Sequence, residues 1–140
     1  MESLFHNVEQ RRSISPVAVL DDTAQVGQII DHSGFGAVLY LIAAGTLADA
    51  AATFAVLLEH GDAANLSDAA AVPDADLIGT EALAGLTQAD DNEVRKLGYK
   101  GTKRYSRLTI TPTGNSASAP ISAVCLLGRG KKVPRSSQEA

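Results

Sequence analysis

The stretch RYSRLTIT, residues Arg104–Thr111, decides the fold class. Ser106, Leu108 and Ile110 alternate along it with polar and charged residues. This repeat of two is typical of a strand that turns one face to a core and the other to water. The stretch therefore predicts a half-buried β-strand.

Three further runs have the length of a strand. The run AVLYLIAA at 37–44 is apolar on both alternating phases, which predicts a strand covered on both faces, whereas TFAVLLEH at 53–60 and the run at 119–128 also suit strands. Turn-forming Gly, Asn, Asp, Ser and Pro separate the runs at intervals of roughly 8–15 residues. We therefore expect an all-β fold, an antiparallel β-sandwich of jelly-roll or immunoglobulin-like type. The runs 37–44 and 53–60 are expected to pair as a hairpin, and the Ala-rich stretch 64–71 leaves room for at most one short helix.

The 140 residues suffice for one domain. The polar beginning predicts an extended N-terminal arm over residues 1–20, followed by the sandwich at 21–128 and a loose C-terminal tail at 129–140. The N-terminus lacks the apolar segment of a signal peptide, and no apolar run is long enough to cross a bilayer. We therefore expect no membrane partner.

Composition argues against nucleic-acid binding. The net charge is −4, aromatic residues make up 4% of the chain, and Trp is absent. Nucleic-acid binding draws on excess positive charge and on exposed rings that stack with bases. The single cysteine, Cys125, excludes an internal disulfide, and its place in an apolar run predicts a buried, inert thiol.

No catalytic constellation is recognisable in the sequence. His6, His32 and His60 are scattered without the spacing of metal ligands, and no GxSxG nucleophile elbow occurs. The paired aspartates at 21–22 and 90–91 lie in turn-forming stretches. We expect no enzyme activity, no catalytic residue, no bound metal and no cofactor.

Candidate contact residues come from two basic clusters. One is a pair of arginines near the N-terminus, and the other surrounds two tyrosines in residues 96–107. Tyr and Arg commonly anchor protein interfaces, although a charged strand edge can also serve to prevent aggregation. The predicted contact residues are Arg11, Arg12, Tyr99, Lys103, Arg104, Tyr105 and Arg107.

Three segments in fixed order carry a resemblance to a known group of proteins: FAVLLEHGDAANLSDAAAV at 54–72, DADLIGTEA at 74–82 and LGYKGTKRYSRLTITPTGNSASAPISAVCLLG at 97–128. Together they resemble small virion structural proteins of tailed bacteriophages that are encoded among the head genes. The resemblance covers roughly residues 24–130. It implies a capsid decoration, or cement, protein that bridges and stabilises major capsid subunits. It also implies a place on the capsid exterior, reached from the host cytoplasm during assembly, and partners that are the major capsid protein and further copies of the chain in a homotrimer.

Other functions remain open at this point. A head–tail connector or tail-completion protein would assemble as a ring. A glycan- or receptor-binding β-sandwich would need exposed rings to stack on sugars, and the chain has three Tyr and three Phe to offer. A hydrolase would need a nucleophile and a base, which the sequence does not supply.

Overall fold

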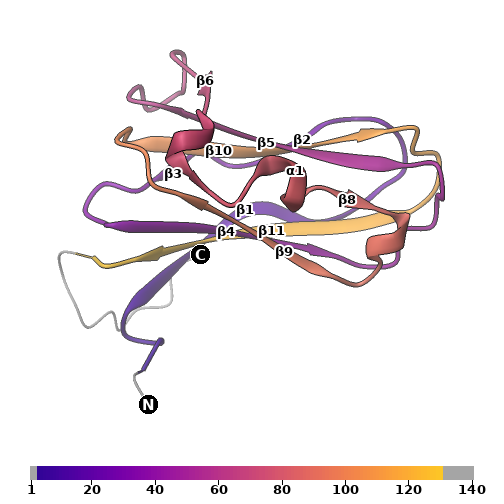
Figure 1. Ribbon diagram of the computed structural model, residues 1–140, viewed down its shortest axis with the longest axis horizontal. Coiled ribbons are helices and arrows are strands. Elements are labelled where there is room, and N and C mark those ends of the chain that lie inside the picture. The colour runs from indigo at the N-terminus through magenta and orange to yellow at the C-terminus, as the bar shows by residue number, and fades with distance from the viewer. Residues whose placement is uncertain (1–2, 131–140) are drawn as a thin grey trace.

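The computed structural model describes residues 3–130 as two antiparallel β-sheets packed face to face (Figure 1). Sheet A has the strand order β1 (Val8–Val19), β11 (Ala119–Gly128), β4 (Ala37–Ala44), β9 (Val94–Tyr99) and β7 (Leu77–Ile78). Sheet B has the order β2 (Gln25–Val26), β10 (Tyr105–Thr113), β5 (Thr53–Gly61) and β6 (Ala70–Ala71), with β3 (Ile30–Asp31) also paired to β10 and β8 (Leu86–Thr87) to β5. The antiparallel β-sandwich is thus confirmed.

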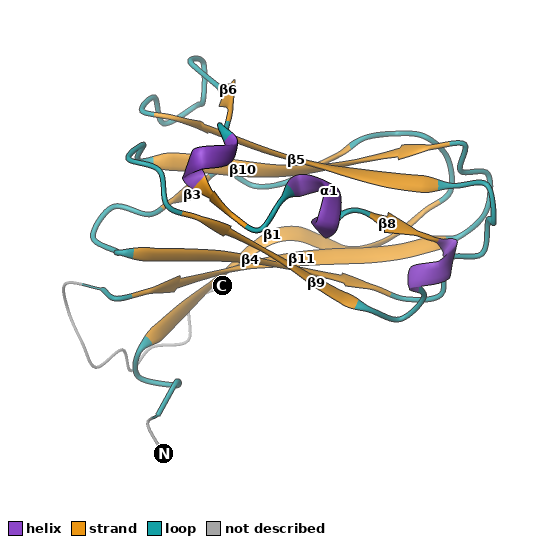
Figure 2. Ribbon diagram, in the orientation of Figure 1, coloured by secondary structure: helices purple, strands orange, loops and turns teal. Residues whose placement is uncertain are grey.

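Helical structure in the described chain is confined to α1 (Glu81–Ala84) and two 3₁₀ turns at Asp74–Asp76 and Gln88–Asp90. The helix packs against β5 and β9 and closes one open side of the sandwich (Figure 2). Thr80 caps it by accepting the Leu83 N–H at 3.1 Å, and the Glu81 carboxylate accepts the Leu58 N–H of β5 at 2.7 Å. No helix in residues 3–130 is long and apolar enough to cross a membrane.

The core lies between the inner faces of the two sheets. The alternation in β10 turns Ser106, Leu108 and Ile110 inward, and each of these residues is fully buried. Other fully buried residues come from the facing strands of sheet A, namely Tyr40, Ile42, Leu97, Cys125 and Leu127. The buried position predicted for Cys125 is confirmed, and burial raises the pKa of its thiol to about 12.

The predicted hairpin of residues 37–44 and 53–60 is wrong, because the two strands lie in different sheets. β4 pairs with β11 and β9, whereas β5 pairs with β10 along its whole length. The connection between them leaves sheet A along β11, where Gly45 donates to the Pro120 carbonyl at 2.8 Å and Ala48 donates to the Ser118 carbonyl at 3.2 Å. The Ala-rich stretch 64–71 is not helical either, because Leu66 has a positive φ of 51° in a turn before β6.

The predicted boundary of the N-terminal arm is also corrected. Residues 8–19 form β1, which pairs with β11 at one edge of sheet A. The ladder shifts register between Arg12 and Ile14 and again between Ile14 and Val17. Such bulges change which residues face the core, so β1 lacks the regular alternation that marks β10. Of the predicted C-terminal tail, residues 131–140 lie outside the described residues.

Candidate functional site

The predicted contact residues do not form one surface. Arg11 and Arg12 lie on β1 at the edge of sheet A. Lys103 and Arg104 lie just before β10, and Tyr105 and Arg107 lie on β10 in sheet B. The roles of the exposed members as interface residues stay predictions.

The prediction that Tyr99 contacts a partner is wrong, because its side chain lies in the interior of the sandwich. It is 4% exposed, and its hydroxyl accepts the Lys103 N–H at 3.1 Å. The same hydroxyl is hydrogen-bonded to His60 Nδ1 at 2.9 Å, and the His32 ring lies 5.1 Å from the Tyr99 ring. A buried ring held in this way has no surface with which to contact a partner.

Three of the basic side chains of this cluster are paired with carboxylates. Lys103 Nζ lies 2.9 Å from Asp62, Arg104 lies 2.9 Å from Asp31, and Arg107 lies 3.1 Å from Glu59. The hydrogen bond from Arg104 lowers the pKa of Asp31, and that from Lys103 lowers the pKa of Asp62. The Arg104 guanidinium also lies 5.1 Å from the centre of the Tyr105 ring. These pairs offset the charges of Lys103, Arg104 and Arg107, so these three side chains do not offer an acidic partner unpaired cations.

Two histidines lie in a buried polar cluster at this end of the sandwich. His32 Nε2 is hydrogen-bonded to Ser106 Oγ at 3.1 Å, and the same oxygen bonds the Tyr40 hydroxyl at 2.7 Å. Burial lowers the pKa of His32 to about 4. Within residues 3–130, no group of three His, Cys, Asp or Glu side chains could hold a metal ion. The cluster satisfies the hydrogen-bonding needs of polar groups in the core.

The outer face of sheet A is apolar, which the sequence did not reveal as a site. Leu39 of β4 lies across the ladder from Leu126, and Leu41 lies across from Val124. Neighbouring Val94 is 64% exposed. We call this surface the apolar face; its members are Leu4, Leu39, Leu41, Ile78, Leu83, Val94, Val124 and Leu126. The signal was present in residues 37–44, which are apolar on both phases although no element of the described chain covers their outer side.

The surface carries hollows of about 440–860 Å³, and the one of about 860 Å³ lies on the apolar face. Small residues line its base, with Gly98 and Gly128 beside Leu39. Ile78 and Leu83, which are 61% and 74% exposed, rise at the β7–α1 side. The lining contains no aromatic side chain. This apolar groove can take aliphatic side chains but has no ring on which a sugar could stack.

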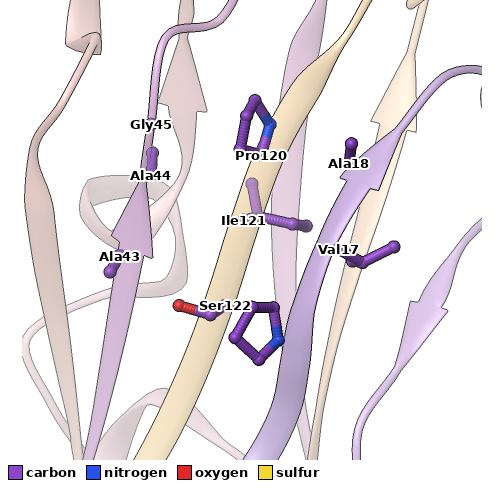
Figure 3. A pocket seen from close by; sticks show the side chains of 9 residues that line it. Val17, Ala18, Ala43, Ala44, Gly45, Pro120, Ile121 and Ser122 are labelled. Atoms are coloured by element: carbon purple, nitrogen blue, oxygen red, sulfur yellow. The ribbon is translucent and has the colours of Figure 1, made fainter.

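The apolar face continues to the other end of sheet A as a shallower hollow of about 440 Å³ (Figure 3). Val17, Ala43 and Pro120 are among its lining residues, and the Ser122 hydroxyl is the polar side-chain group there. Small side chains from three adjacent strands keep this end low. The face is therefore apolar over most of the length of β4.

A second kind of groove runs along β1 and has a volume of about 460 Å³. Gln10, Arg11, Arg12 and Gln28 line it together with aliphatic residues that include Ile29. Arg11 is paired with Glu9, whereas Arg12 is exposed and has no ion-pair partner in the described part of the chain. This polar groove combines planar hydrogen-bonding groups with an aliphatic surface.

No family model and no curated protein matches the sequence. Among solved structures, a xylan-binding module CBM15 is 12% identical, with a TM-score of 0.49 over 94% of this chain and 96% of that chain. The CBM22-1–GH10 modules of Clostridium thermocellum Xyn10B, complexed with xylohexaose, are 10% identical at a TM-score of 0.43, over 95% of this chain and 28% of that chain. The CBM22-1 xylan-binding domain of Paenibacillus barcinonensis Xyn10C is 10% identical at a TM-score of 0.39, over 97% and 91%.

These neighbours contradict the function predicted from the sequence. The prediction of a capsid decoration protein is contradicted, because the three solved structures named above are or contain carbohydrate-binding modules. At TM-scores below 0.5 they assign no ligand to this chain. The resemblance to phage proteins, the location on a virion and the capsid partner are not tested and stay predictions.

Proposed function

We propose that this chain is a non-catalytic binding module that attaches to a protein partner through its apolar face. The single observation that carries the proposal is the apolar groove on the outside of sheet A. In an antiparallel sandwich the outer face of a sheet is normally polar, because water covers it. On this face, Leu4, Ile78, Leu83 and Val94 are each more than 60% exposed. A contiguous apolar surface of this kind marks an interaction site.

The chemistry of the apolar face favours protein over sugar. Most of its exposed side chains are aliphatic, with Arg95 and Lys96 as the charged members of the groove lining, whereas sugar rings bind best to aromatic rings and to convergent polar groups. The outer face of sheet B provides the contrast, because Thr109 and Thr111 of β10 there face Leu57 and Ala55 across the ladder, with Arg107 and Glu59 beside them. The two outer faces therefore differ in polarity, and the apolar one is suited to a partner with apolar side chains of its own.

Site-specific photo-crosslinking tests this proposal in cells that produce the chain. A benzophenone side chain replaces Val94 on the apolar face, and in a matched variant it replaces exposed Thr111 on sheet B. We expect a discrete adduct at position 94 that is absent at position 111 and is lost when Leu83→Asp is added. Equal labelling at both positions, or no adduct at position 94, would overturn the proposal.

Saccharide binding is a second candidate, and the polar groove along β1 favours it. Amide and guanidinium groups from Gln10, Gln28 and Arg12 can bond to neighbouring sugar hydroxyls above an aliphatic surface. Affinity electrophoresis in gels containing xylan tests this candidate. Retardation that is reversed by Arg12→Ala together with Gln28→Ala would support it, with Thr111→Ala as the control. Unchanged migration of the wild-type chain would exclude xylan as the ligand.

A further inference from the structure

We infer that the partner of the apolar face is a second copy of this chain, packed about a two-fold axis. The inference rests on the proposed function and names its occupant. It joins three observations: a groove and a raised wall on the same face, the area of the face, and the way its charges are placed.

The groove and the wall lie side by side on the apolar face. Ile78 and Leu83 form the wall, and the adjoining base is low because Gly98 and Gly128 have no side chains. The Gly98 backbone and the Ile78 side chain lie so close together that a Cβ atom at position 98 would be 2.9 Å from the Cβ of Ile78. A surface that carries a projection beside a hollow can be its own complement. Rotation by a half-turn places the wall of each copy in the groove of the other.

This geometry favours two copies over three. A two-fold contact uses one surface on both subunits, whereas a three-membered ring needs two different surfaces that fit each other. In residues 3–130 the broad apolar surface lies on one face, the outside of sheet A. We therefore replace the homotrimer expected from the sequence with a homodimer.

The area of the apolar face matches what a stable dimer requires. A standard interface buries about 800 Å² on each partner, of which about 60% is apolar. The exposed fractions of the five most exposed aliphatic residues of the face together equal about three whole side chains, or roughly 300 Å² of surface in water. These residues are Leu4, Ile78, Leu83, Val94 and Val124. Half-buried Leu39, Leu41 and Leu126 add to this area. The total approaches the apolar share of one partner, so a single contact can cover the face.

The charges on the face do not prevent the contact. Lys96 lies across the ladder from Leu41, and Arg12 lies across from Val124. Both have long apolar stems that can lie on an aliphatic surface while the charged ends reach water. Two flat sheet faces that meet in this way pack at a distance of about 10 Å, as the layers of a sandwich do.

Sedimentation equilibrium of the purified full chain over a dilution series tests the inference. We expect a species of two chains that dissociates on dilution. Leu83→Asp and Val94→Asp place a charge at exposed positions of the interface, and each should weaken dimerisation by roughly tenfold or more. Leu57→Asp, on the outer face of sheet B and 38% exposed, is the control and should leave the dimer intact. Circular dichroism and a urea transition establish that each variant is folded.

Two results would overturn the inference that the partner is a second copy of this chain. One is a wild-type chain that remains monomeric at every concentration, and the other is a dimer that persists in both folded apolar-face variants. The photo-crosslinking experiment separates this failure from failure of the proposed function. A monomer with a position-94 adduct of some other mass overturns the homodimer and leaves the protein-binding function standing. A monomer with no adduct overturns both.

Discussion

The Tyr99 hydroxyl and His60 Nδ1 lie 2.9 Å apart in the interior of the sandwich, where β9 of sheet A faces β5 of sheet B. This hydrogen bond joins the two sheets through their core. The Lys103 N–H donates to the same hydroxyl and thereby fixes the turn before β10. One oxygen atom thus links β9 both to β5 of the other sheet and to the turn that follows β9.

Removal of this oxygen should destabilise the fold. In Tyr99→Phe, the His60 ring nitrogen and the Lys103 N–H each lose a partner, and a buried polar group left unpaired costs about 1–3 kcal/mol. Urea denaturation should show a loss of that size in the free energy of unfolding. Tyr105→Phe, which removes a hydroxyl from the outer side of β10, is the control and should change the stability little. Equal losses in the two variants would contradict the role given to the Tyr99 hydroxyl.

Acid should weaken the fold through His32. Burial lowers the pKa of this histidine to about 4 in the folded chain, below its ordinary value of 6.5. The nearby Asp31 carboxylate opposes this shift, and His60 adds to it. Because the unfolded chain binds the proton more readily, the contribution of neutral His32 is complete above about pH 6.5 and is lost as the pH falls towards 4.

The measurement is the free energy of unfolding in urea between pH 7 and about pH 4. His32→Gln keeps a side chain that can bond to Ser106 but does not titrate, so its stability should fall less steeply over this range. The carboxylates Asp31 and Asp62, whose pKa values are lowered, lose their contributions at still lower pH. If the free energy of unfolding falls in parallel with pH in the wild-type chain and in His32→Gln, His32 is ruled out as the source of the acid sensitivity.

Cys125 should be unreactive until the chain unfolds. Its thiol is fully buried, and burial raises its pKa to about 12, so very little thiolate exists near neutral pH. Ellman's reagent should label the native protein only at the rate of unfolding and should label it at once in denaturing urea. Thr111→Cys adds an exposed thiol as the control for reagent activity. Rapid labelling of the native wild-type chain would show that the core opens at this point.

Gly98 should tolerate no side chain while Ile78 lies across from it. Gly98→Ala puts a methyl group 2.9 Å from the Cβ of Ile78, so β7 must move away from β9. Overpacking of this kind costs about 1–3 kcal/mol. Ile78→Ala leaves the Cβ in place but removes the atoms beyond it, which lie 3.3–3.4 Å from the added methyl group. Part of the cost should therefore be relieved in the double variant, and strict additivity of the two changes would argue against the clash.

Local alternation predicted strand positions well but did not predict which strands pair. The pattern of Ser106, Leu108 and Ile110 correctly gave the inward face of β10, because a repeat of two depends only on the strand itself. The partners of β4 and β5 depend on the path of the connection between sheets, which no local pattern records. β1 escaped prediction because two bulges shift its phase and because it lies at an edge, where polar residues are common.

The candidate site was predicted less well than the fold. Tyr and Arg were assigned to an interface by residue type, although Tyr99 shares the phase of buried Leu97 on β9 and so belongs inside. The apolar character of residues 37–44 predicted a strand covered on both faces, whereas Leu39 and Leu41 lie on the outside of sheet A. Their apolar character was visible in residues 37–44, but exposure depends on the whole fold, which leaves that side open.

The position of β11 has a consequence for how the chain is made. This strand is the last one in residues 3–130, yet it lies between β1 and β4 in sheet A. Val8 pairs with Gly128, so the two strands that meet there lie at opposite ends of the described chain. Contacts between such distant residues form slowly, and the growing chain cannot close sheet A until its final strand has left the ribosome. Truncation before residue 119 should therefore yield a chain that is recognised by chaperones and proteases rather than a smaller sandwich.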